Sequence, residues 1–162
     1  MDSENVNNLF RRTSFVVADV ENSANFYQNI FGWTRFYDHA TPVDKSFPPC
    51  APDQTLANII ILKADDPFIG MIGFMEYEGY LPETRVDVSR KTLGVGDAIL
   101  IVESKNIQQA YNNAIREGAT IVTEPVEWTV KDHSGQGVIH LSTFSFFDPN
   151  GIYVEVNTRL SK

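Results

Sequence analysis

The pattern of hydrophobic and polar positions along this chain occurs twice. In the first half, a strand-like run leads through Asp19 into an amphipathic stretch that ends at Gly32. In the second half, a similar run leads through Asn106 into an amphipathic stretch that ends at Gly118. Three strand-like runs follow each glycine. Internal similarity outweighs local propensity, so we predict an α+β protein of two βαβββ modules whose curled mixed sheets form a central cleft.

Local signals place the elements of the first module. Asp19 is a favourable helix N-cap, and Gly32 suits the left-handed conformation that ends a helix. The apolar residues between them recur at helical spacing. Residues 38–54 are proline-rich, and we expect either a lid over the cleft or a tolerated excursion there. Apolar and β-branched runs predict strands at 13–18, 33–37, 56–63 and 68–77, with a turn at 64–67.

The second module repeats this order after a polar segment. Pro125 indicates an edge strand or a bulge, and residues 148–151 have the composition of a tight hairpin turn. The predicted strands lie at 97–103, 119–131, 138–147 and 152–158. We therefore divide the chain into a leader over 1–11, a first module over 12–78, a linker over 79–93 and a second module over 94–160.

The composition narrows the choice of partners. The chain has 162 residues, of which 43% are hydrophobic and 21% are charged, as in an ordinary globular protein. A net charge of −8 argues against a nucleic acid or an anionic membrane as the main partner. Without an apolar membrane span or a signal-peptide core, we expect a cytoplasmic protein. Cys50 is the sole cysteine, which excludes an intrachain disulfide and a thiolate metal cluster.

Several short motifs resemble those of the vicinal oxygen chelate superfamily, which includes glyoxalases, bleomycin-resistance proteins, fosfomycin-resistance proteins and extradiol dioxygenases. The resemblance covers roughly residues 12–158 and implies the same two-module fold. The motifs are Val17 to Ser23, Phe26-Tyr27, Phe31-Gly32-Trp33, Gly94 to Asp97, and Phe147 to Val156 with its Asp148-Pro149-Asn150-Gly151 turn. Fold by analogy does not fix function.

The resemblance also implies positions for metal ligands at the cleft. Glu155 in the last strand lies where the superfamily places a carboxylate ligand. Asp97 and Arg12 each lie where many members have a histidine, and Glu76 is the nearest carboxylate to the remaining position. A metal site would therefore consist of Glu76, Asp97 and Glu155, with Glu155 also a candidate catalytic residue.

Arg12 changes the chemistry that these positions can support. An arginine has no acceptor atom and keeps its proton, so it cannot bind a cation. The remaining carboxylates would suit magnesium or manganese better than zinc. Alternatively, Arg12 pairs with Asp97 or Glu155 and anchors an anionic ligand group. A third reading is that Arg12 is an ordinary surface residue at the start of a strand.

Two further residues are candidates if their strand faces the cleft. His140 shares a face with Ser142, Phe144 and Phe146 by the two-residue period of a strand. On the cleft side, His140 could act as a general base and Phe144 could line an apolar pocket for an aromatic ligand. On the other side, both are ordinary sheet residues. The histidines at 39 and 133 fall in predicted loops.

Three hypotheses follow. We favour a protein that binds a small organic molecule, anionic or aromatic, in the cleft without a cofactor, through Arg12, Asp97 and Phe144. The first alternative is a lyase, isomerase or dioxygenase that uses a divalent metal, which could be Mg, Mn, Fe, Zn or Ni. The second alternative is a non-catalytic interaction module. In each case we expect a homodimer.

Overall fold

The computed structural model describes residues 10–46, 48–66 and 69–161, which form two compact units. One unit comprises residues up to 82 except 29–31, and the other comprises 29–31 and the residues from 83 onward. Residues 1–9 of the predicted leader lie outside the described residues. The elements are β1 (Arg12–Val16), α1 (Val20–Phe31), β2 (Thr34–Pro42), β3 (Leu56–Lys63), β4 (Met71–Tyr77), β5 (Ile99–Glu103), α2 (Ile107–Arg116), β6 (Thr120–Lys131), β7 (Val138–Phe147) and β8 (Tyr153–Arg159).

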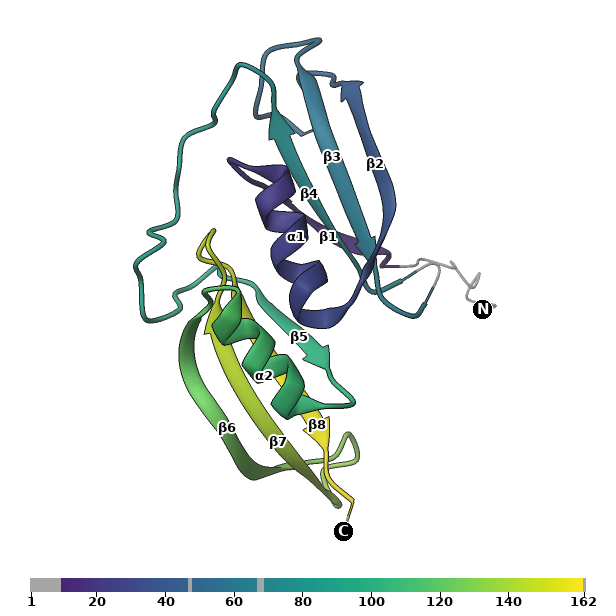
Figure 1. Cartoon of the computed structure of the whole chain (residues 1–162), viewed down its shortest axis with the longest axis vertical. Helices are drawn as coiled ribbons and strands as arrows, with labels where there is room; N and C mark the ends of the chain where they lie inside the picture. Colours follow the sequence, from purple (N-terminus) through teal and green to yellow (C-terminus); the bar gives the residue numbers. More distant parts are fainter. Residues whose placement is uncertain (1–9, 47, 67–68, 162) are drawn as a thin grey trace, which may run out of the picture. The chain divides into compact units, whose positions relative to one another are not determined.

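The two modules have the same topology, as the repeat predicts. The first sheet has the strand order β1-β4-β3-β2, and the second has β5-β8-β7-β6. In each sheet the first strand pairs parallel to the last, and the other pairs are antiparallel. Figure 1 shows one helix lying against each sheet. The α+β class and the doubled βαβββ order are confirmed, while the central cleft stays a prediction.

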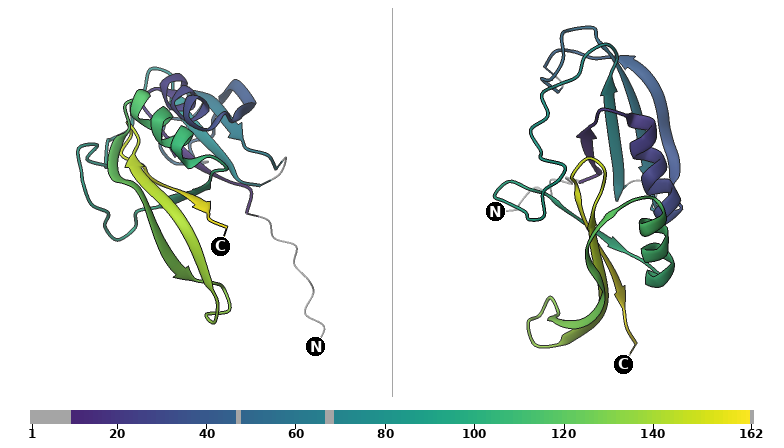
Figure 2. Two further views of the ribbon diagram at one scale, coloured as in Figure 1. Left: turned by 60° about the horizontal axis from the view of Figure 1, so that its bottom comes forward. Right: turned by 60° about the vertical axis from the view of Figure 1, so that its left-hand side comes forward.

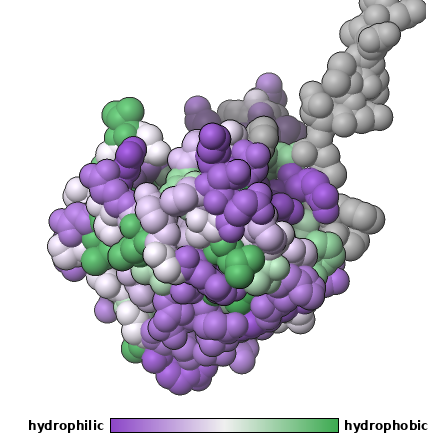
Figure 3. Space-filling view, turned by 90° about the horizontal axis from the view of Figure 1, so that it is seen from above, coloured by the Kyte–Doolittle hydropathy of each residue, from purple (hydrophilic) through white to green (hydrophobic). Residues whose placement is uncertain are grey.

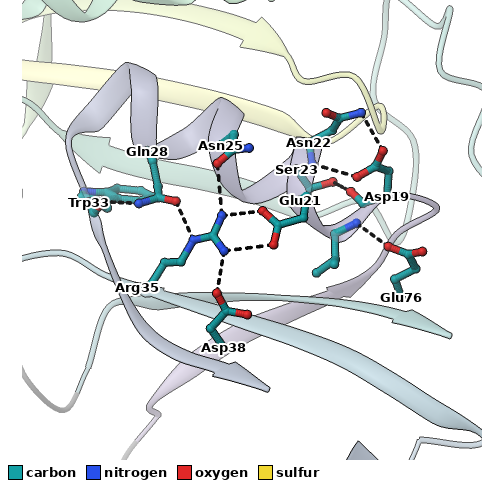
Figure 4. A network of polar contacts seen from close by, with 11 residues as sticks. Asp19, Glu21, Asn22, Ser23, Asn25, Gln28, Trp33, Arg35, Asp38 and Glu76 are labelled. Carbon is teal, nitrogen blue, oxygen red and sulfur yellow. Dashed lines mark hydrogen bonds and ion pairs between the residues drawn. The ribbon is translucent and has the colours of Figure 1, made fainter. Parts of the chain in front are cut away.

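The helix caps follow the sequence signals. The Asp19 carboxylate accepts a hydrogen bond from the backbone N–H of Asn22 at 2.8 Å (Figure 4), and the Asn106 side chain accepts one from Gln109 at 3.0 Å. These bonds satisfy amides that lack partners inside the helix. Gly32 ends α1 with φ 71°, a left-handed conformation that glycine adopts without steric cost.

Each hydrophobic core lies between a helix and its sheet. In the first unit, the Tyr27 ring of α1 lies 5.3 Å from the Phe74 ring of β4, and both residues are fully buried. In the second unit, Tyr111 of α2 meets Phe144 of β7 edge-on at 5.4 Å.

Polar residues cover most of the face in Figure 3, where hydrophobic groups are small and separate. The face of each sheet that points away from its helix is called its open face below.

β2 and β4 depart most from their predicted bounds, and a predicted irregularity in β6 is confirmed. β2 continues to Pro42 because residues 37–42 pair with β3, although proline made this stretch appear irregular. β4 begins at Met71, and the predicted strand start at Phe68 lies outside the described residues. Pro125 does mark a bulge, since the register of the edge strand β6 shifts between Thr123 and Val126.

The loop after β2 packs on the first sheet. Val43 is buried with Ala57 and Tyr77, and Cys50 packs against them. The Cys50 Sγ atom lies 2.7 Å from the Tyr77 hydroxyl. Burial, and then this contact, raises the pKa of Tyr77. The loop therefore covers part of the open face of the first sheet, while a lid over the cleft stays a prediction.

The segment between the modules contains neither helix nor strand from residue 78 to 98. Figure 2 shows it as a long connection between β4 and β5. Within the described part of the chain, no helix is long and apolar enough to cross a membrane.

Candidate functional site

Strand register separates the residues of the second sheet into two faces. Residues paired across neighbouring strands point to the same side of a sheet. Phe144 pairs with Val156 and packs against α2, so their side is the helix face. The next residues along, Ser145 and Glu155, pair with each other on the opposite side. The open face of the second sheet includes Ile99, Ile101 and Glu103 of β5; Tyr153, Glu155, Asn157 and Arg159 of β8; Leu141, Thr143, Ser145 and Phe147 of β7; and Val126 and Trp128 of β6.

A chain of hydrogen bonds crosses this open face and ends at Glu155. The Trp128 indole N–H donates to the Thr143 hydroxyl at 2.7 Å, and that hydroxyl donates to the Asn157 side-chain carbonyl. The Asn157 amide then donates to Glu155 Oε1 at 3.0 Å. Because an indole only donates, the direction of the whole chain is fixed toward the carboxylate. This hydrogen-bond chain holds one carboxylate oxygen, Oε1, and thereby orients the Glu155 side chain.

Two buried polar atoms of the second unit have no hydrogen-bond partner among the residues that the structure describes. They are Ser145 Oγ and Arg90 Nε. Ser145 is only 2% exposed and lies directly beside Glu155 in the sheet register. Buried polar groups are nearly always paired, and an unpaired one costs about 1–3 kcal/mol. The unpaired Ser145 hydroxyl beside Glu155 therefore indicates a place where a ligand or water supplies the missing bond.

Exposed hydrophobic residues flank these polar groups. Ile101 pairs with Glu155 and is 62% exposed, and Ile99 next to it on the open face is 48% exposed. On the far edge of the sheet, Val126 and Trp128 are also exposed. Apolar surroundings with a few convergent polar groups are typical of small-molecule sites.

Asp97 is held by an arginine other than the one predicted. Arg90 Nη1 lies 2.6 Å from Asp97 Oδ1, and the Gly94 N–H donates to Oδ2 at 2.6 Å. The Arg90 guanidinium, and next the Gly94 N–H, hold the pKa of the Asp97 carboxyl below its ordinary value. Asp97 thus has an arginine partner within its own unit, and its pairing with Arg12 stays a prediction. Arg90 lies in the polar linker, where no motif or spacing indicates a role.

Arg90 also fastens the linker to the second sheet. Its Nη2 donates to the Gly151 carbonyl at 2.8 Å, and its guanidinium lies over the Phe147 ring at 5.4 Å from the centroid. The cation therefore closes one end of the open face, where the turn after β7 begins.

The two predicted residues of the first module, Glu76 and Arg12, lie at different places on its sheet. Glu76 accepts a hydrogen bond from the Val20 N–H at 2.9 Å, at the start of α1 (Figure 4). The Glu76 side chain thus lies on the helix face of its sheet and caps a helix that favours negative charge. Arg12 is exposed and pairs with Met71 at the edge of the sheet. Its anchor role stays a prediction.

The helix caps align the two modules and show which position matches Glu155. With Asp19 aligned to Asn106, Arg12 aligns with Ile99 rather than with Asp97, and the partner of Ser14, Gly73, aligns with Glu155. A Cβ atom on Gly73 would lie 2.5 Å from Ser14 Oγ, so this position has no room for a carboxylate while Ser14 keeps its place. The first sheet has no counterpart of Glu155.

Phe144 and His140 lie on the helix face of the second sheet. Phe144 is 0% exposed and packs against Tyr111 and Phe146 as a core residue, so nothing in its surroundings supports the predicted ligand contact. His140 shares that face and pairs with Thr129 of β6. It therefore points away from the side that carries Glu155, and the two cannot act on one bound molecule.

The predicted metal ligands do not fit a divalent cation. Both oxygens of Asp97 are bonded, one of them to a guanidinium that would repel a cation, and Glu76 caps α1. Of the three, Glu155 alone has an unpartnered oxygen on an open face within the described residues, since Glu76 lies on the helix face of its sheet. Across those same residues, no group of three or more His, Cys, Asp or Glu side chains could hold a metal ion.

Comparisons with known proteins agree with the resemblance seen in the sequence. The sequence model of the Glyoxalase/Bleomycin resistance protein/Dioxygenase superfamily matches residues 10–156. A glyoxalase family protein from Bacillus cereus has a similar structure, with a TM-score of 0.71 and 15% identity over 97% of this chain and 99% of that chain. A comparison with curated protein sequences found no match.

Two further structures extend the fold comparison. An integron cassette protein from V. Cholerae matches with a TM-score of 0.51 and 23% identity, over 93% of this chain and 94% of that chain. A glyoxalase I mutant from Zea mays matches with a TM-score of 0.59 and 16% identity, over 91% of this chain and 45% of that chain. At such low identity, the structural matches support the fold and not a particular activity.

Proposed function

Because the chain belongs to the glyoxalase/bleomycin resistance protein/dioxygenase superfamily, we propose that it binds a small organic molecule on the open face of its second sheet. The observation that carries this proposal is the buried, unpartnered Ser145 hydroxyl beside Glu155. A ligand with a polar group satisfies that hydroxyl, while its apolar part covers Ile99, Ile101 and Trp128.

The proposed binding needs no resident metal. Of the three carboxylates considered, Asp97 is neutralised by Arg90, and Glu76 caps a helix on the helix face of its sheet. Within the described chain, Glu155 therefore has the one unpartnered oxygen of this set that lies on an open face. A single carboxylate oxygen is too small a donor set to retain a divalent cation.

The proposal favours binding over turnover. His140, the candidate general base, lies on the opposite face from Glu155. The hydrogen-bond chain that ends at Glu155 starts at a donor-only indole, so it orients the carboxylate but gives no route for removing a proton. Glu155 thus acts in recognition, and Thr143 and Asn157 act as its positioning residues.

Substitution of an exposed rim residue tests the location of the site. We expect Ile101→Asp to weaken binding of 2-naphthylmethanol, a planar apolar probe, about tenfold, because it removes apolar contact area and places a charge there. Val138→Asp is the matched control, since Val138 is 51% exposed on the helix side of the same sheet. Isothermal titration calorimetry in EDTA measures both affinities.

Two outcomes would contradict the proposal. Equal affinities of the two variants would place the binding elsewhere. Loss of binding in EDTA that Mg²⁺ or Zn²⁺ restores would contradict the metal-independent part of the proposal and leave the location intact.

A further inference from the structure

We infer that the group recognised at this face is a protonated amine, held between Glu155 Oε2 and Ser145 Oγ. This inference rests on the proposed function, because it specifies the ligand of the same site. Three observations support it: the direction of the hydrogen-bond chain, the unpaired hydroxyl and the balance of charge on the face.

The direction of the hydrogen-bond chain determines which carboxylate oxygen Glu155 presents to a ligand. The Trp128 indole must donate to Thr143, so the Thr143 hydroxyl directs its own proton to the Asn157 carbonyl. The amide nitrogen of Asn157 is then turned to Glu155 Oε1. Glu155 is held as an acceptor, and for its Oε2 atom the described chain provides no donor. Oε2 can therefore accept a hydrogen bond from a donor group on a bound molecule.

The position of Ser145 indicates how many hydrogen-bond donors the polar group of the ligand carries. Ile101, Glu155 and Ser145 form one row across β5, β8 and β7, so the free hydroxyl and the free carboxylate oxygen are neighbours. A hydroxyl oxygen accepts up to two hydrogen bonds, and an ammonium group donates three. One ammonium can therefore donate to both atoms, while Ile101 on the other side of Glu155 contacts the apolar part of the ligand.

The charges around this row leave Glu155 without a counterion. Arg90, one row away, is matched by Asp97 at 2.6 Å. Arg159 lies opposite Leu141 in the strand register, two rows of residues away from Ser145. Glu103 lies opposite Asn157 and adds a second negative charge. No ion pair to Glu155 occurs in the described ranges 10–46, 48–66 and 69–161. A cationic ligand supplies that charge, and its hydrogen bond to a carboxylate is stronger than a neutral one.

A matched series of probes tests the inference on the whole protein. 2-Naphthylmethylamine, 2-naphthylmethanol and 2-naphthoic acid share one ring system and differ in the charge of the polar group. We expect the amine to bind about tenfold more tightly than the alcohol at pH 7, with the acid weakest, as measured by calorimetry.

Substitutions separate recognition of the amine from general adhesion. Glu155→Gln keeps the acceptor for Asn157 but removes the charge, so the amine should lose its tenfold advantage while the affinity for the alcohol changes less than about twofold. Ser145→Ala should weaken the amine less than Glu155→Gln does. Glu127→Gln is the control, since Glu127 is exposed on the helix side of the sheet and pairs with Ser142.

The outcomes distinguish the two proposals. If the amine and the alcohol bind equally and Glu155→Gln changes neither affinity, the inference fails and the proposed site stands. If none of the three probes binds, both proposals fail. The comparison of the three probes uses the unmodified protein, so it tests the inference even if a variant does not fold.

Discussion

At the scale of single residues, the position of a carboxylate on the sheet decides what it can do. Glu155, Asp97 and Glu76 all matched ligand positions by resemblance, yet only Glu155 has a free oxygen on an open face within the described chain. Asp97 is a structural partner of Arg90, and Glu76 is a helix cap. The same residue type thus has three roles, which depend on the donors that reach it.

The Asp97 pair predicts a dependence of stability on pH. Because the pKa of Asp97 is lowered in the folded protein, the stabilisation is present above its ordinary value of about 3.9 and is lost as the pH falls through the lower folded value. The difference in unfolding free energy between the native protein and Asp97→Asn should therefore shrink below about pH 4. Urea denaturation at pH 7 and pH 3 measures this, and a constant difference would contradict the role of the pair.

At the scale of elements, a single arginine ties α1 to β2. Arg35 Nε donates to Gln28, Nη1 to Asp38 and Glu21, and Nη2 to Glu21 and Asn25 (Figure 4). Of these partners, the carboxylates of Glu21 and then Asp38 raise the pKa of Arg35, so the guanidinium stays charged. The planar fork of arginine matches this set of acceptors, and an ammonium group does not.

Loss of the fork should destabilise the first module. We expect Arg35→Lys to lower the unfolding free energy by about 1–2 kcal/mol, because the charge is kept while several hydrogen bonds are lost. Arg85→Lys is the control, since Arg85 is 83% exposed and lies 3.7 Å from Glu83. Urea denaturation that shows equal midpoints for the two variants would mean that the network adds little stability.

At the scale of the whole molecule, the repeat predicts the fold but not the site. Hydrophobic periodicity and the N-caps Asp19 and Asn106 were enough to predict both modules, since these signals are local in sequence. The period of two correctly grouped His140 with Phe144. It did not indicate that this face meets α2, because both faces of the strand carry apolar residues.

The site depends on contacts that are remote in the sequence. Arg90 reaches Gly151 from a linker without regular structure, and Trp128 reaches Glu155 through two intervening side chains. Neither contact leaves a fixed spacing in the chain. The match of Gly73 with Glu155 likewise requires the register of the strands. Without the register, the sequence indicates Glu76 for this position, because the alignment of the strand is uncertain by a few residues.

The two tryptophans give the most direct measurement of the central claim, which is that a small molecule binds on the open face of the second sheet. Trp128 lies on that face, whereas Trp33 stacks on Tyr27 in the first module. Titration of ¹⁵N-labelled protein with 2-naphthylmethylamine, with the indole signals assigned through Trp128→Phe, follows both residues in one NMR spectrum. We expect the Trp128 indole N–H signal to shift and saturate while the Trp33 signal stays in place. A saturating shift of Trp33 with an unchanged Trp128 would contradict the account.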